Sequence, residues 1–166
     1  MYEVGEFIVH PGQGVCRVDE IVEEPQPTYL LMPVGMRHPM RISFPVASED
    51  RRRPIVGADE ARRLIDGYAA MEVDDFRAKS GALEEEHFKD LIRRGSCEDS
   101  VRIVKTFRER IAEVRARNKR PPVAHERILK LASQRSLIEL ATALDLSTED
   151  VVALFEERGA DFANDN

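Results

Sequence analysis

The side chains most often used for catalysis or metal binding are few and widely separated in this sequence. Cys16 and Cys97 form no Cys-x-x-Cys pair, and no two histidines have the spacing of metal ligands. A structural zinc site needs four clustered ligands, while a catalytic nucleophile or a phosphate-binding loop carries a local signature that we do not find. We therefore expect a protein that is not an enzyme and that uses no metal, cofactor or small-molecule substrate. The histidines are His10, His38, His87 and His125.

Composition narrows the class of protein further. The chain has 166 residues, of which 42% are hydrophobic, enough for a core in one compact domain or two small ones. No apolar run approaches the roughly 20 residues of a membrane helix, and the opening Met1–Glu6 lacks the order of a secretory signal. Two isolated cysteines favour a reducing compartment. We expect a cytoplasmic protein with no membrane partner.

Positive charge is concentrated in one predicted helix, although the net charge of the chain is −6. A basic helix on an acidic protein is a candidate phosphate-binding surface. The alternative is a solvated helix face whose charges form local ion pairs, such as Glu113 with Arg117. The sequence leaves both interpretations open. The basic residues of this helix are Arg102, Lys105, Arg108, Arg110, Arg115, Arg117, Lys119 and Arg120.

Short β-type runs separated by Gly and Pro fill the first third of the chain. Turn residues at 11–14 connect the first two runs, and the prolines at 25 and 27 prevent extension of a strand ladder. Val15, Val18 and Ile21 do not alternate strictly, which indicates a bend or bulge. Strands this short favour a small, strongly bent antiparallel sheet or barrel. The predicted strands are Phe7–Val9, Val15–Ile21, Tyr29–Pro33 and Arg41–Val46.

The last predicted strand, Arg41–Val46, suits the edge of this sheet. It begins with a charged residue and has Pro45 near its end. An edge strand presents unpaired backbone groups, so it is either blunted or used to pair with another chain. The simpler interpretation is that Pro45 only ends the strand.

The remainder of the chain has helical periodicity. Gly81 is a weak point in the second predicted helix, Gly95 suits its C-terminal cap, and Ser96 with Asp99 suits a capping box for the third. A similar pair, Ser147 and Asp150, begins the last helix. We predict a β-rich domain at 1–54, a helical domain of about five helices at 55–160 and a disordered tail at 161–166. The predicted helices are Ala58–Tyr68, Asp74–Arg94, one from Ser96 to before Pro121, Ala124–Leu144 and one from Ser147 to before Gly159.

The last two helices have the rhythm of a helix-turn-helix. The second of them, Thr148–Arg158, would be the recognition helix, yet it carries four acidic residues and one arginine. Such a helix would be repelled by DNA phosphates. We therefore interpret this segment as a packed helical hairpin.

The opening segment VGEFIVHPGQGV, residues 4–15, resembles the start of the CarD/CdnL family of bacterial transcription regulators, whose N-terminal module is shared with the transcription-repair coupling factor. The resemblance continues through Tyr29–Leu31, Ile42–Val46 and Arg53–Val56. The helical part is similar in layout, so the resemblance covers nearly the whole chain. The helical matches are Phe88–Gly95, Val101–Arg110 and Ile138–Ala143.

This resemblance implies an α+β protein with a Tudor/SH3-like β module followed by a helical bundle. It implies that the β module binds the RNA polymerase β subunit by edge-strand pairing, and that the helical module contacts upstream promoter DNA and stabilises the open complex. The implied polymerase contacts are Arg41, Ser43 and Pro45. The implied DNA contacts are Arg77, Lys79, Lys89, Arg93 and Arg94.

The sequence departs from the family at two places. The best-known members insert a Trp into the minor groove, whereas this chain has no Trp and carries Gly81 in the corresponding stretch, Lys79–Leu83. The polymerase-facing strand has Ser43 where the family has a basic residue. The alternative function is therefore a polymerase-bound or other protein–protein adaptor without DNA contact.

Overall fold

A tight hairpin begins the structure, as the turn residues predict. The computed structural model describes residues 1–162, and the chain divides into two units, the first covering Met1–Ile55 and the second beginning at Val56. In the first unit, β1 (Phe7–His10) pairs with β2 (Gly14–Val22) in antiparallel register. Gly14 has a φ of +77°, a conformation that glycine adopts without steric cost.

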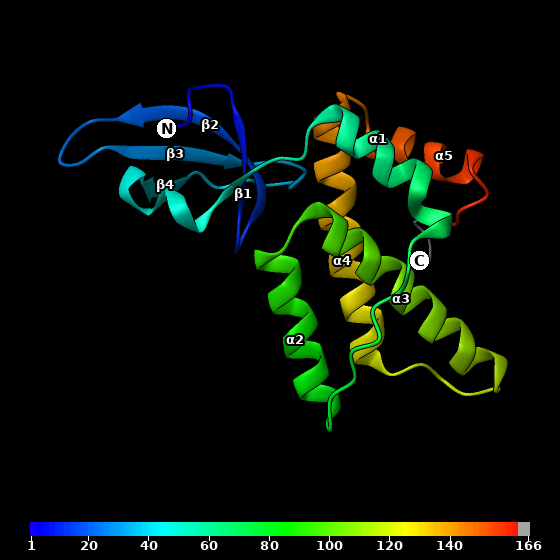
Figure 1. Cartoon of the computed structure of the whole chain (residues 1–166). Helices are drawn as coiled ribbons and strands as arrows, with labels where there is room; N and C mark the ends of the chain where they lie inside the picture. Colours follow the sequence, from blue (N-terminus) through cyan, green and yellow to red (C-terminus); the bar gives the residue numbers. More distant parts are fainter. Residues whose placement is uncertain (163–166) are drawn as a thin grey trace. The chain divides into compact units, whose positions relative to one another are not determined.

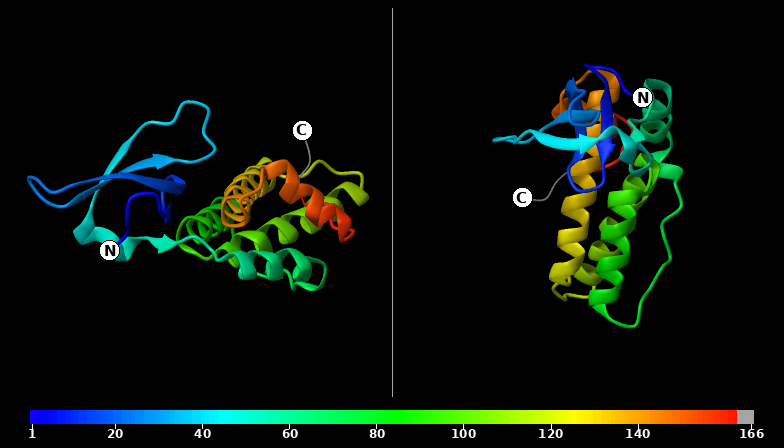
Figure 2. Two further views of the ribbon diagram at one scale, coloured as in Figure 1. Left: turned by 90° about the horizontal axis from the view of Figure 1, so that it is seen from above. Right: turned by 90° about the vertical axis from the view of Figure 1, so that its left-hand side faces the viewer.

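Three more strands complete a five-stranded antiparallel sheet with the order β4-β3-β2-β1-β5 (Figure 1). They are β3 (Thr28–Pro33), β4 (Ile42–Pro45) and the two-residue β5 (Arg53–Pro54). The strands twist strongly (Figure 2), and the register shifts between Val18 and Glu20, so the predicted bulge is confirmed. β4 is an edge strand, and β5, which no sequence pattern predicts, forms the other edge.

The first unit has its own hydrophobic core on one side of the sheet. Phe44 of β4 packs against it while its neighbour Ser43 is exposed, which is the alternation of an edge strand with one buried face. A 3-10 helix, η1 (Val46–Arg51), leads from β4 to β5. The fully buried side chains are Ile8, Cys16, Val18, Tyr29 and Leu31.

Between Val56 and Phe162 the structure has five α-helices, and a 3-10 turn, η2 (Tyr68–Ala70), follows the first of them. The α+β fold class is thereby confirmed. Both predicted capping boxes are present, with Ser96 and Asp99 at the start of α3 and Ser147 and Asp150 at the start of α5. The helices are α1 (Ala58–Gly67), α2 (Gly81–Arg94), α3 (Cys97–Ala116), α4 (Val123–Leu144) and α5 (Thr148–Glu157).

The second helix is shorter than the sequence predicts. We placed its start at Asp74, but α2 begins at Gly81, and Ser80 caps it by accepting a hydrogen bond from the Leu83 N–H. Residues 71–80 instead form an extended segment, which we call the strap. The Asp74 carboxylate accepts a hydrogen bond from the Phe76 N–H at 2.8 Å, and such a local side-chain bond competes with helix formation.

Gly95 is the C-terminal cap of α2, as predicted, but not because of a left-handed conformation. Its φ is −81°. A Cβ at this position would lie 2.7 Å from the Asp99 Oδ2 and still closer to the Leu91 carbonyl oxygen. Glycine is therefore required so that α2 can end directly against the capping box of α3.

The helical core extends to Phe162, which differs from the disordered tail predicted at 161–166. Phe162 is fully buried, and its ring stacks on that of Phe155 with a centroid distance of 3.9 Å. The apolar area that this ring buries opposes fraying of the chain. The rest of the predicted tail, residues 163–166, lies outside the described residues.

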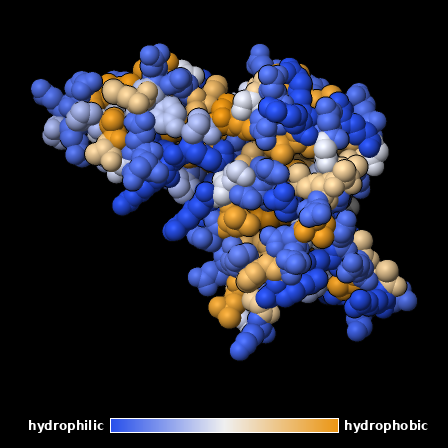
Figure 3. All heavy atoms as spheres, viewed as in Figure 1, coloured by the Kyte–Doolittle hydropathy of each residue, from blue (hydrophilic) through white to orange (hydrophobic). Residues whose placement is uncertain are grey.

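The viewed surface is predominantly hydrophilic, with small hydrophobic patches rather than one continuous apolar face (Figure 3). Within residues 1–162, no helix is both long and apolar enough to span a bilayer.

Candidate functional site

The open side of β4 is defined by one hydrogen bond at its end. The Val46 N–H donates to the Pro27 carbonyl oxygen at 2.9 Å, so residue 46 faces β3. Because backbone groups of successive residues in an antiparallel strand alternate between the two sides, Phe44 also faces β3. The N–H and C=O of Ser43 therefore point to the open edge, where another strand could pair.

The implied polymerase contacts are Arg41, Ser43 and Pro45, and the backbone groups of all three lie on the side away from β3. The three residues are nevertheless not equivalent. Pro45 has no N–H, and its carbonyl oxygen already accepts a hydrogen bond from Arg52 Nη2 at 3.3 Å. Arg41 is exposed and lies 3.7 Å from a Glu20 carboxylate oxygen. Among residues 1–162, no group pairs with the backbone N–H or C=O of Ser43, so this residue of β4 offers both a donor and an acceptor.

Arg52 lies behind this edge, in a run of three arginines at residues 51–53 that the sequence allows as an electropositive contact or as a polar linker. Its guanidinium carbon is 3.5 Å from the centroid of the Phe44 ring and 5.1 Å from that of Tyr29. The side chain is buried, and its Nε and Nη1 have no hydrogen-bond partner among the described residues. Burial lowers the pKa of Arg52. Stacking on Phe44 and bonding to Pro45, Arg52 holds β4 in place.

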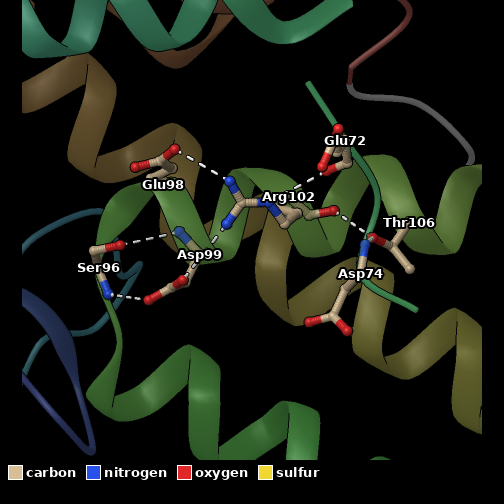
Figure 4. Close-up of polar contacts among 7 residues, drawn as sticks. All are labelled: Glu72, Asp74, Ser96, Glu98, Asp99, Arg102 and Thr106. Atoms are coloured by element: carbon tan, nitrogen blue, oxygen red, sulfur yellow. Dashed lines mark hydrogen bonds and ion pairs between the residues drawn. The ribbon is translucent and has the colours of Figure 1, made fainter. Parts of the chain in front are cut away.

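The basic residues in the middle of α3 hold the strap rather than face solvent. Lys105 Nζ donates to the Met71 carbonyl oxygen at 2.5 Å, and Arg102 Nε donates to that of Glu72 at 3.2 Å. The Thr106 hydroxyl accepts the Asp74 N–H at 2.9 Å. Figure 4 shows the Arg102 and Thr106 side chains reaching the strap from α3. These side chains satisfy backbone groups that have no strand or helix partner.

Arg110 connects the strap to α2 inside the helical unit. Its Nη1 lies 3.0 Å from Glu84, and its Nη2 donates to the carbonyl oxygens of Asp74 and Phe76 at 3.1 and 2.8 Å. His125 Nε2 is 3.3 Å from the same Glu84 carboxylate. Burial lowers the pKa of Arg110, with the nearby charge of Arg77 acting in the same direction. In this part of α3, Arg102 forms a local pair with Glu98, as the ion-pair interpretation predicts, whereas Arg110 is bound by the strap and by Glu84 of another helix, which neither interpretation predicts.

The structure places the implied DNA contacts on two neighbouring elements. Arg77 and Lys79 are exposed on the strap, and Arg93 is exposed on α2. The other two, on α2, have carboxylate partners: Lys89 Nζ lies 3.0 Å from Glu85, and Arg94 Nε lies 3.2 Å from Asp90. Arg77, Lys79 and Arg93 have no such partner within the described residues.

Glu85 is the most strongly paired carboxylate on this surface. Its two oxygens accept hydrogen bonds from Arg127 Nε and Nη2 at 2.8 and 3.0 Å, and Lys89 approaches from the next turn of α2. These bonds, those from Arg127 first, lower the pKa of Glu85 to about 2. The carboxylate thereby joins α2 to α4 and restrains Lys89.

Replacing Arg127 by glutamine is expected to raise the pKa of Glu85 towards its usual value of 4.5. Because the folded-state pKa is lowered, the pair stabilises the fold fully above the unfolded-state pKa and loses this effect as the pH falls to about 2. The free energy of unfolding of Arg127→Gln should therefore fall below that of the native chain at neutral pH and converge with it under acid. Chemical denaturation of both proteins, repeated at several pH values from neutral to about pH 2, measures the difference between their free energies of unfolding.

Replacing Arg94 by glutamine is the matched control, because the Arg94–Asp90 pair is an exposed pair within one helix. An NMR titration of the Glu85 carboxyl carbon would contradict the assignment if its pKa were the same in Arg127→Gln as in the native chain.

Residues 2–56 match a family model described as the CarD-like/TRCF RID domain, and this range contains all five strands. A search of curated proteins found no match for the chain. The resemblance predicted from residues 4–15 is thereby confirmed. The first unit is a CarD-like/TRCF RID domain, the module that CarD-like proteins share with the transcription-repair coupling factor.

Proposed function

We propose that this chain is a transcription regulator that binds the β subunit of RNA polymerase through the open edge of β4, contacts upstream promoter DNA with its helical unit, and thereby stabilises the open complex. The first part rests on one observation. In a domain of a family whose modules typically bind RNA polymerase, the Ser43 N–H and C=O are turned towards an unoccupied sheet edge. Such a role would place the protein in the cytoplasm.

The form of this edge supports strand addition. Main-chain hydrogen bonds give affinity when a partner strand joins a sheet, and side chains on alternate residues give specificity. Ser43 contributes both backbone groups without a bulky side chain in the way, while the exposed Arg41 can favour an acidic partner strand. Arg52 fixes Phe44 and Pro45 before the partner arrives, which lowers the cost of ordering the strand on binding.

A pull-down of the polymerase β-subunit lobe by the full chain tests this proposal. We expect retention of the lobe at low and at moderate salt, because backbone pairing depends little on ionic strength. No retention at low salt would overturn the polymerase assignment. Counting open complexes formed by purified polymerase with and without the chain then tests the regulatory part.

The strap and the start of α2 support contact with DNA. Arg77, Lys79 and Arg93 are exposed cations suited to phosphate groups. Leu83, in the first turn of α2, is 56% exposed and lies in the stretch that corresponds to the family's Trp. Leucine is among the side chains that proteins insert between base steps from the minor groove, and hydrophobic atoms are visible at the lower end of α2 in Figure 3.

The second candidate, a polymerase-bound adaptor without DNA contact, is favoured by the net charge of −6 and by the carboxylate partners of Lys89 and Arg94. Titration of a short DNA duplex with the chain at several salt concentrations separates the two functions. Phosphate contacts predict affinity that falls steeply as salt rises. An adaptor binds polymerase but shows no duplex binding even at low salt.

A further inference from the structure

The connection between α3 and α4 carries four basic residues within six positions, Arg115–Arg120. We infer that three of them, Arg117, Lys119 and Arg120, form a second phosphate-binding surface for duplex DNA, which we call the basic connection. This inference rests on the DNA contact proposed above and adds a site that the implied contacts on the strap and α2 do not include.

The basic side chains of the connection have different surroundings from those of α3, which ends at Ala116. The cations earlier in the helix are bonded within the unit; Arg108 Nε, for example, donates to the Phe162 carbonyl oxygen at 2.9 Å. Arg117, Lys119 and Arg120 are exposed, and their side chains have no carboxylate or carbonyl partner in the part of the chain that the structure describes. Three exposed cations that no carboxylate of the described residues neutralises are available to bind phosphate groups.

The backbone of this connection is fixed. The Asn118 N–H donates to the Arg115 carbonyl oxygen at 2.9 Å and the Lys119 N–H to that of Val114 at 3.2 Å. Asn118 has a φ of +57°, a turn conformation that asparagine tolerates better than most residues. Pro121 is buried directly afterwards. A fixed backbone presents the three cations together and reduces the entropy lost when they bind phosphates.

The basic connection lies at the same end of the helical unit as the start of α2, as two views agree (Figures 1 and 2). Glu84 lies in the first turn of α2, and His125 lies in the first turn of α4, which directly follows the connection. His125 Nε2 is 3.3 Å from the Glu84 carboxylate, so the starts of the two helices are in contact. Burial lowers the pKa of His125, the neighbouring Glu84 carboxylate opposes this shift, and the charges of Arg110 and Arg77 add to it. Strap and connection can therefore contribute to one positive surface.

A helix C-terminus favours cations by itself, which offers a purely structural reason for basic residues here. That effect is confined to the last turn, however, and α3 ends at Ala116. Lys119 and Arg120 lie beyond it and gain little from the helix dipole. These two residues are therefore the ones to change in a test, because their replacement should leave the stability of α3 nearly unaltered.

Three double variants make the test: Lys119→Gln/Arg120→Gln in the connection, Arg77→Gln/Lys79→Gln in the strap, and Arg62→Gln/Arg63→Gln on α1. The α1 pair is a matched control, since both arginines are exposed and each already has a carboxylate partner in the same helix. Arg62 lies 3.4 Å from Asp59, and Arg63 lies 3.5 Å from Glu60. Each variant and the native chain are titrated with one short DNA duplex over a range of salt. Each phosphate contact adds about 0.9 to the slope of log Kd against log salt. We expect the connection variant to lose roughly 2 from that slope and the α1 variant to keep it.

The outcomes separate this inference from the function on which it rests. If the native chain fails to bind the duplex at low salt, the DNA contact itself is wrong, and the inference falls with it. If the native chain binds and the strap variant loses slope while the connection variant keeps the native slope, only the inference is overturned. Thermal unfolding of every variant confirms that the comparison is between folded proteins.

Discussion

Replacing Ser43 by proline is expected to weaken binding to the polymerase β subunit by at least about tenfold, whereas Ser43→Ala should bind nearly as the native chain does. Proline removes the outward N–H, and the lost hydrogen bond alone costs about 0.5–1.5 kcal/mol. Its ring also occupies the space in which the partner strand would lie. Alanine keeps both backbone groups and removes only the hydroxyl. Surface-plasmon measurements of the immobilised β-subunit lobe compare the two variants directly.

The β unit should remain folded in Ser43→Pro. Proline is tolerated in edge strands where the missing N–H would face away from the sheet, and the hydrogen bonds of β4 to β3 involve the neighbouring residues Ile42 and Phe44. Circular dichroism provides the check. Native affinity in Ser43→Pro would show that β4 is not the docking edge, and an equal loss in Ser43→Ala would assign the contact to the hydroxyl instead of the backbone.

Much of the β unit could be predicted from local sequence, because each of its longer strands is flanked by Gly or Pro. The bulge followed from the spacing of Val15, Val18 and Ile21, and the edge position of β4 from Arg41 and Pro45. β5 could not be predicted, since two residues, one of them proline, carry no strand pattern. The outward direction of Ser43 depends on the strand register, which only the bond from Val46 to Pro27 reveals.

The helical unit was predicted less well where distant residues decide the structure. The helix expected from Asp74 is a strap because its backbone is bonded to Thr106 and Arg110, more than 30 residues away. The same contacts explain the basic residues of α3. Charge is visible in the sequence, but a carbonyl partner on a strap is not, so the sequence could not separate the internal cations from those of the basic connection.

Replacing Arg110 by methionine is expected to lower the free energy of unfolding of the helical unit by about 3–5 kcal/mol, the usual cost of breaking a buried ion pair from one side. The variant leaves Glu84, which is only 8% exposed, without its arginine partner. It also leaves the carbonyl oxygens of Asp74 and Phe76 without a donor. Chemical denaturation followed by the circular dichroism of the helices measures the loss.

The double variant Arg110→Met/Glu84→Gln is the control, because it removes the buried charge that the single variant leaves with His125 as its neighbour but without its arginine. We expect it to recover part of the lost stability, as a double-mutant cycle would show. A loss below about 1 kcal/mol in Arg110→Met would contradict the role of Arg110 in the core.

Hydrogen exchange locates the effect of the same substitution. Residues 71–80 should exchange faster in Arg110→Met, because the strap loses the side chain that joins it to α2. Arg77 and Lys79 lie on that strap, so duplex binding should weaken, while binding of the polymerase β-subunit lobe through β4 should stay at the native level. Ser43→Pro should show the reverse pattern. Loss of both activities in either variant would mean that the two contacts are not carried by separate surfaces.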